Sequence, residues 1–202
     1  MNASRLPRRR LDPEQRRASI LEVATRLLAA DPYPEVSLAR VAEEAGASEA
    51  LVHKYFATKP DLYAEVLATT LGALWQRTMD ADAALPPHSS ARDRVRAGLL
   101  VYLDHVAAHP TGWASPFQSA PNDPQPAREA RREVRTRYVA ALDALLVPDP
   151  TPRRRYAVAA FHGFLEAAAL AWAEAGCPDA DRHPLVDAAL GALEGAIGDW
   201  GR

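Results

Sequence analysis

Apolar residues recur every three or four positions along most of the chain, the spacing of helices that bury one face. Proline, glycine and helix-capping residues divide this pattern into segments. It predicts an all-α fold of about nine helices. We place them near residues 13–30, 37–45, 48–56, 58–85, 90–109, within 111–127, and at 128–147, 153–176 and 184–200.

The segment from Ser37 to Lys59 contains two short predicted helices separated by a glycine turn. Ser37 and Ser48 are each placed to cap a helix, and Gly46 can adopt the left-handed conformation that ends the first one. The second helix keeps its apolar anchors on one face and turns small, imidazole and ammonium groups to the other. Such a face suits a DNA groove better than a catalytic pocket.

This segment resembles the helix-turn-helix of the tetracycline-repressor (TetR) family of transcriptional regulators. The resemblance covers about residues 12 to 70 and is carried by Ala45-Gly46, the Ser48 cap, Tyr55-Phe56, and Thr58-Lys59 followed by Asp61-Leu62. At Ala50-Leu51-Val52-His53 this chain departs from the family, which often has Gly or Ala, then Thr, then Leu-Tyr. The resemblance implies an N-terminal three-helix DNA-binding domain joined to a C-terminal helical domain that binds a ligand and dimerises.

The second short helix is the predicted DNA-reading element, and double-stranded DNA is its predicted partner. We expect Glu49, Ala50 and His53 to face base edges, while Lys54, Tyr55 and Lys59 contact phosphates. The full predicted set is Ser48, Glu49, Ala50, Leu51, His53, Lys54, Tyr55 and Lys59. Lys59 also begins a long helix, whose free amide groups can bind an anion or serve only as a well-capped end.

The charge distribution supports a DNA-binding N-terminus, although the net charge is only −2. Residues 1–30 contain seven arginines against three acidic residues. We expect a flexible basic arm at 1–11, a helix-turn-helix domain at 12–58, and an effector-binding and dimerisation domain at 59–202. The arm either contacts DNA phosphates or a minor groove, or is a solubilising tail. A single cysteine and the absence of a leader-like apolar segment indicate the cytoplasm.

Large apolar side chains gather in the second half of the long helix and in the helices that follow it. Where the family resemblance implies a ligand cavity, we predict that they bind a small hydrophobic effector. These residues are Trp75, Met79, Tyr102, Trp113, Phe117, Phe161 and Phe164. The proline-rich stretch from Thr111 to Ala127 either gates this cavity or fills the core. His162 and Glu166, four residues apart, either hold a polar group of the effector or hydrogen-bond to each other.

The last two helices carry the predicted dimer interface. The helix at 153–176 is apolar nearly all round, but it is alanine-rich and has Glu166 near its middle, so we reject a membrane span. The final helix has a strict apolar stripe and many small residues, and together the two helices are expected to form half of a four-helix interface. The predicted homodimer contacts are Trp172, Val186, Leu190, Leu193 and Ile197.

The sequence contains none of the common enzyme signatures that we sought: a phosphate-binding glycine loop, an H-E-x-x-H motif or a serine elbow. His105 and His109 have metal-compatible spacing, but without a third ligand nearby we expect favourable charges at a helix C-terminus instead. We therefore expect no catalytic residues, metal or cofactor.

Three classes of function remain open. The first is a homodimeric repressor that binds a palindromic operator and is released by a hydrophobic effector. The second is a constitutive or activating DNA-binding regulator with a vestigial pocket. The third is a helical ligand carrier or enzyme that does not use DNA.

Overall fold

The protein is described by a computed structural model, which covers residues 12–118 and 123–198. Within these ranges it has nine α-helices, one short 3₁₀-helix and no strand. Their bounds are α1 Pro13–Ala30, η1 Tyr33–Glu35, α2 Leu38–Glu44, α3 Glu49–Tyr55, α4 Lys59–Ala83, α5 Ala91–Ala108, α6 Pro110–Gln118, α7 Gln125–Leu145, α8 Pro152–Glu174 and α9 Asp179–Ile197. The predicted all-α architecture is therefore confirmed. The predicted basic arm at 1–11 lies outside the described residues.

The first three helices begin and end where local chemistry dictates. Asp12 accepts a hydrogen bond from the Gln15 amide, and the Gln15 side chain accepts one from the Asp12 amide, which forms a capping box at the start of α1. The Ser37 and Ser48 side chains cap α2 and α3 by accepting hydrogen bonds from the Arg40 and Leu51 amides. Gly46, with a φ of 59°, occupies the left-handed region in the turn between these two helices. The predicted helix-turn-helix is thus present.

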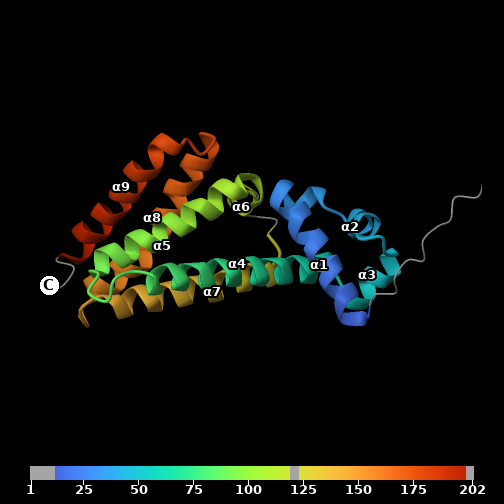
Figure 1. Ribbon diagram of the computed structural model, residues 1–202, viewed down its shortest axis with the longest axis horizontal. Coiled ribbons are helices and arrows are strands. Elements are labelled where there is room, and N and C mark those ends of the chain that lie inside the picture. Colours follow the sequence, from blue (N-terminus) through green and yellow to red (C-terminus); the bar gives the residue numbers. More distant parts are fainter. Residues whose placement is uncertain (1–11, 119–122, 199–202) are drawn as a thin grey trace, which may run out of the picture.

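Helix α4 is the structural link between the two ends of the molecule (Figure 1). Its first turns contribute Leu62, Tyr63 and Val66 to an apolar core shared with α1, α2 and α3. Its later turns pack against α5 and α7. A rearrangement of α4 would therefore be felt in both cores.

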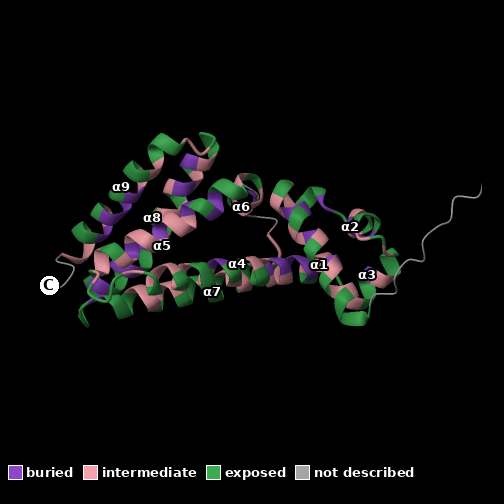
Figure 2. Ribbon diagram, viewed as in Figure 1, coloured by how far each residue is buried: buried purple, intermediate pink, exposed green. Residues whose placement is uncertain are grey.

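A second core lies between α5, α8 and α9, and it corrects the predicted dimer contacts. Trp172, Val186, Leu190 and Leu193 are all buried inside the protomer. Ile197 is half-buried and packs against the same core. The apolar stripe of the last helix therefore binds its own chain. Figure 2 shows buried positions along one side of α9 and exposed positions along the other.

The ends of the last two helices add two further findings. Helix α9 begins at Asp179, five residues before the predicted start, and includes Pro184 in its early part. Among the described helices, only α8 has the length and apolar composition needed to cross a membrane, a test that core helices of soluble proteins also pass.

Candidate DNA-binding surface and effector cavity

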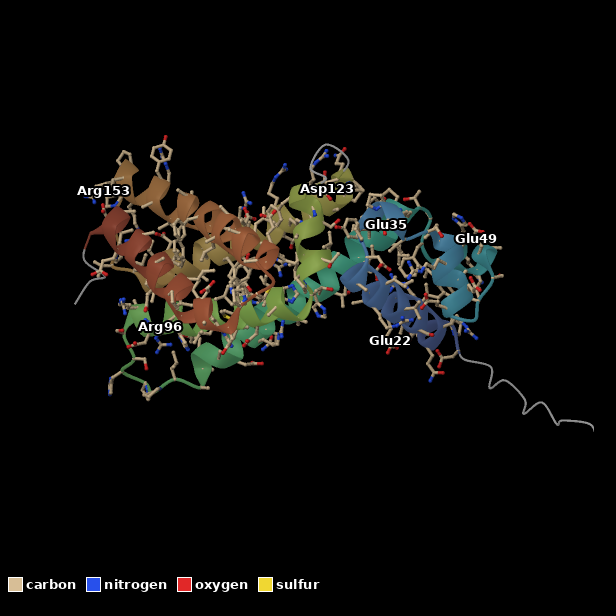
Figure 3. The ribbon with its side chains drawn as sticks, turned by 90° about the horizontal axis from the view of Figure 1, so that it is seen from above. Glu22, Glu35, Glu49, Arg96, Asp123 and Arg153 are labelled. Atoms are coloured by element: carbon tan, nitrogen blue, oxygen red, sulfur yellow. The ribbon has the colours of Figure 1, made fainter. Side chains whose placement is uncertain are left out.

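Helix α3 presents an exposed polar face at the end of the molecule opposite α9 (Figure 1). Ser48, Glu49, Ala50, His53 and Lys54 are exposed. Val52 is fully buried and fixes the rotation of the helix, so these side chains point outward. Figure 3 places Glu49 at this end and Arg153 at the other. The exposed part of the predicted set is therefore accessible to a DNA groove.

Three members of the predicted set are less accessible. Leu51, Tyr55 and Lys59 are only partly exposed. Tyr55 packs against the core of the three N-terminal helices. The Lys59 ammonium donates to the Pro34 carbonyl oxygen at 3.3 Å and lies 4.2 Å from the centre of the Tyr33 ring. Its partial burial lowers the pKa of Lys59. The Pro34 carbonyl oxygen uses one of the three N–H donors of this ammonium.

His53 has local partners on both sides of its ring. Its Nδ1 atom is 3.2 Å from the Ala57 carbonyl oxygen, and its Nε2 atom is 3.9 Å from a carboxylate oxygen of Glu49. Because a carbonyl oxygen only accepts, Nδ1 carries the proton in the neutral ring. Nε2 is then the acceptor nitrogen of the ring.

Behind Lys59, a contiguous stack of side chains runs from the N-terminal core to α7. The Tyr33 and Tyr63 rings stack with centroids 4.5 Å apart. The Tyr63 hydroxyl accepts a hydrogen bond of 2.6 Å from Arg131, which is also paired with the Asp123 carboxylate. Asp123 is labelled beside the start of α7 in Figure 3. Tyr63 and Arg131 also line a cavity in the helical bundle. The stack thus links the wall of that cavity with the start of α4.

A cavity of about 1210 Å³ occupies the space between α1, α4, α5, α6, α7 and α8. Its lining follows α4 from Tyr63 to Asp82, which corresponds to about 28 Å of helix. Most of the lining is apolar, and α1 contributes Leu21 and Leu28. The cavity therefore touches the DNA-binding core as well as the C-terminal helices.

The structure separates the predicted effector residues into two groups. Met79, Tyr102, Trp113, Phe117 and Phe161 line the cavity. Trp75 and Phe164 do not: Trp75 packs edge-on against Tyr138, with centroids 5.0 Å apart, and Phe164 is 39% exposed on the outer side of α8. The prediction was wrong for these two because apolar size does not reveal which face of a helix borders a cavity.

Charged groups that line the cavity are largely paired within the protein. Arg135 donates two hydrogen bonds, of 2.6 and 2.7 Å, to the Glu166 carboxylate. Glu166 lies 3.4 Å from His162 Nδ1. Although burial opposes the shift, His162 and Arg135 together lower the pKa of Glu166. Arg94 pairs with Asp82 in the same way, at 2.7 Å, so the interior offers little unpaired charge to a ligand.

Helix α6 connects the cavity to α1 through an unusually close contact. A Cβ atom on Gly112 would lie 2.3 Å from the Leu28 carbonyl oxygen, which only glycine avoids. The buried Ser115 hydroxyl accepts a hydrogen bond of 3.4 Å from the Tyr33 amide. Part of the predicted gate, residues 119–122, lies outside the described residues.

Sequence analysis missed several of these residues. Tyr33, Tyr63 and Arg131 come from three separate elements, and no spacing along the chain relates them. Gly112 is a glycine within a helix that carries aromatic residues, and this position is typical of a close packing contact. The sequence did not show that the contact is with Leu28 in α1. His105 is buried and its pKa is lowered to about 4 by burial, His109 and Arg77, which corrects the expected charge at the end of α5. The described residues contain no cluster of three metal-binding side chains.

A capped helix-turn-helix with an exposed second helix, joined by a long helix to a cavity-containing helical bundle, defines a DNA-binding regulator rather than an enzyme. Residues 20–66 match the family model described as "Bacterial regulatory proteins, tetR family". Residues 20–66 therefore form a DNA-binding domain of the TetR family of transcriptional regulators, as the sequence predicted, and this family is not enzymatic. The carrier-or-enzyme alternative is therefore excluded.

The similarity to known relatives extends beyond this domain. The chain is 28% identical over 154 residues to the HTH-type transcriptional regulator BetI of Agrobacterium fabrum, covering 73% of each protein. It is 32% identical over 96 residues to BetI of Brucella anthropi, covering about half of each: 48% of this chain and 47% of the relative.

Among solved structures, the fold is similar to that of a TetR-family regulator from Streptomyces coelicolor, with a TM-score of 0.75, 23% identity, and coverage of 92% of this chain and 80% of that one. It is also similar to FadR from Bacillus subtilis, solved in complex with stearoyl-CoA. That match has a TM-score of 0.65 and 15% identity, and covers 90% of this chain and 97% of FadR.

Proposed function

We propose that this TetR-family regulator is a homodimeric repressor that binds a palindromic operator and is released by a small hydrophobic effector. The observation that carries the proposal is the cavity whose wall includes both α1 and the C-terminal helices. A ligand in this cavity contacts the DNA-binding core directly. Binding energy can then bias the position of the reading helices.

Two contacts support such coupling. Gly112 packs against the end of α1, while its neighbour Trp113 lines the cavity. The stack of Arg131, Tyr63 and Tyr33 ends at Lys59, at the first turn of α4. A ligand that displaces α6 or α7 would therefore alter the support of α1 and α4.

The chemistry of the cavity favours a mainly apolar effector. Its length along α4 suits an extended molecule, and most of its charges are paired within the protein. FadR of Bacillus subtilis, with a similar fold, has been solved with stearoyl-CoA. We therefore place long-chain acyl compounds first among the candidate effectors.

The exposed face of α8 supports dimer formation. On α8, Ala160, Gly163 and Ala167 are exposed at helical spacing, and Tyr156 nearby is 66% exposed. Small side chains allow two helices to approach closely, and a second copy would cover this apolar surface. A two-fold dimer in turn requires an operator whose half-sites form an inverted repeat.

The experiment has two stages. Genomic DNA fragments retained by the purified protein identify the operator, and fluorescence anisotropy then measures its affinity with and without each hydrophobic compound, including stearoyl-CoA. Salt-sensitive binding to an inverted repeat, weakened by at least one compound, supports the proposal. Specific binding that no compound alters would instead indicate a constitutive or activating regulator. In either case the protein acts on genomic DNA, so we place it in the cytoplasm.

A further inference from the structure

His105 is a polar side chain in the wall of the cavity and is only 6% exposed. It comes from the last turns of α5, between Arg77 on α4 and His109 at the end of α5. A buried imidazole in an apolar wall costs free energy unless its nitrogen atoms are satisfied. The neighbouring residues determine which nitrogen atom of His105 is already hydrogen-bonded and which one can bind a ligand.

Arg77 fixes the tautomer of this imidazole. The Arg77 guanidinium lies 3.4 Å from His105 Nδ1, and a guanidinium can only donate, so Nδ1 is the acceptor. In the neutral ring the proton is then on Nε2. Nε2 has no hydrogen-bond partner among the described residues, which leaves an N–H donor at the cavity wall.

Tyr102 lies one turn earlier on the same helix and also lines the cavity. Residues three apart on a helix are neighbours on one face. Its ring packs edge-on against Trp113, with centroids 6.1 Å apart. Burial and the nearby Glu166 carboxylate raise the pKa of Tyr102, so its hydroxyl remains protonated. The Trp113 side chain is its hydrogen-bond partner. An indole N–H can only donate, so the hydroxyl hydrogen of Tyr102 remains available to a ligand.

We propose that His105 and Tyr102 form a donor pair that selects effectors with a carbonyl-type oxygen on an otherwise apolar body. The pair offers an N–H and an O–H from neighbouring positions on one face of α5, within a cavity whose charges are largely paired. Esters, thioesters, ketones and amides supply the matching acceptor without a charge. This inference rests on the proposed function only in taking the cavity as the effector site.

Ligands that have no hydrogen-bond acceptor, and ligands with a cationic head group, fit this site less well. An alkane leaves both donors without partners, which costs binding energy. A cationic head group would meet the Arg77 guanidinium behind His105 and two donor hydrogens in front of it. The pair therefore discriminates by hydrogen bonding rather than by charge.

The test compares two probes that differ only at one carbon: octanophenone, which has a carbonyl group, and octylbenzene, which has a methylene group there. Their dissociation constants are measured by displacement of Nile red from the full-length protein. The variants are Tyr102→Phe, His105→Leu and His105→Gln, the last of which retains an N–H donor. The measured quantity is the ratio of the two dissociation constants. The two probes differ in hydration, but this difference is the same for every variant, so it cancels when the ratios of two variants are compared.

We expect the preference for octanophenone to fall about tenfold in Tyr102→Phe or His105→Leu and to be retained largely in His105→Gln. Equal ratios in the wild-type protein, Tyr102→Phe and His105→Leu would overturn the proposal. Tyr102→Phe keeps the ring and serves as the decisive variant if His105→Leu does not fold. Operator binding is measured separately, so loss of ligand selectivity is distinguishable from failure of the repressor proposal.

Discussion

The exposed ammonium of Lys54 is the clearest candidate for a phosphate contact on α3, because it has no ion pair among the described residues. Replacing it by glutamine should weaken binding to all DNA sequences and reduce the dependence of log K on log salt by about one unit. Anisotropy titrations at several salt concentrations, with operator and scrambled DNA, measure both effects.

The matched control is Arg132→Gln, which removes an equally exposed cation from α7, far from α3. The wild-type salt slope should persist in this control. A similar loss of slope in both variants would mean that net charge, not a contact by Lys54, governs the affinity.

His105 should make the stability of the protein depend on pH. Its pKa is lowered from 6.5 to about 4 in the folded state, mainly by burial. The unfolded chain therefore binds more protons between these values, so the contribution of His105 is complete above pH 6.5 and is lost as the pH falls toward 4. Between pH 7 and pH 5 this loss should be about 2 kcal/mol.

Urea denaturation at both pH values measures this effect in the wild-type protein and in His105→Gln, which is neutral throughout. Other groups also titrate, so the informative quantity is the difference between the two proteins. The same pH dependence in both would show that His105 is not held in its neutral form.

At the scale of the elements, the contact between α6 and α1 joins one wall of the cavity to the DNA-binding core. Gly112→Ala would place a methyl group against the backbone of Leu28 and Ala29. Because backbone atoms cannot move aside independently, the two helices should separate, at a cost of about 1–3 kcal/mol in stability. Effector-induced release of DNA should also be reduced, which anisotropy with the most effective compound measures.

Gly72→Ala is the corresponding control within α4, where an added Cβ atom meets nothing within 4 Å. It should leave stability unchanged or raise it by up to about 1 kcal/mol. If Gly112→Ala were equally harmless, the close contact would have no role in the folded protein.

The sequence allowed most helices to be predicted because caps and breaks are local. The start of α4 follows from Thr58 and Asp61, and the turn before α3 follows from Gly46. The start of α9 was missed because Pro184 was taken as a boundary, whereas this proline lies inside the helix, where it removes one backbone hydrogen bond.

Tertiary partners could not be predicted in the same way. The sequence identified the apolar stripe of α9, but an apolar stripe does not state whether its partner is the same chain or a second copy. The burial of Leu190 and Leu193 shows that it is the same chain. The stack of Tyr33, Tyr63 and Arg131 depends on how η1, α4 and α7 meet, which no local pattern encodes.

For the whole molecule, the burial of Leu193 inside the protomer determines which substitution can test the dimer. Leu193→Arg should unfold the protomer rather than separate a dimer, because it places a charge in the protomer core. Ala160→Arg, on the exposed face of α8, should instead leave the protomer folded and produce monomers. Sedimentation velocity measures the mass, and circular dichroism confirms folding.

Ala107→Arg on the exposed side of α5 provides the control for an added surface arginine. It should sediment as the wild-type protein does. An intact dimer in Ala160→Arg would remove this face of α8 from the interface.

The central claim is that cavity occupancy and operator binding oppose each other in one molecule. The most direct test measures the dissociation constant of the most effective hydrophobic compound for the free protein and for the operator-bound protein, and the operator affinity with and without that compound. Linkage requires the two ratios to be equal, and we expect a factor of about 5–150. A compound that competes with Nile red for the cavity but changes neither operator affinity nor its own affinity on DNA would contradict the claim.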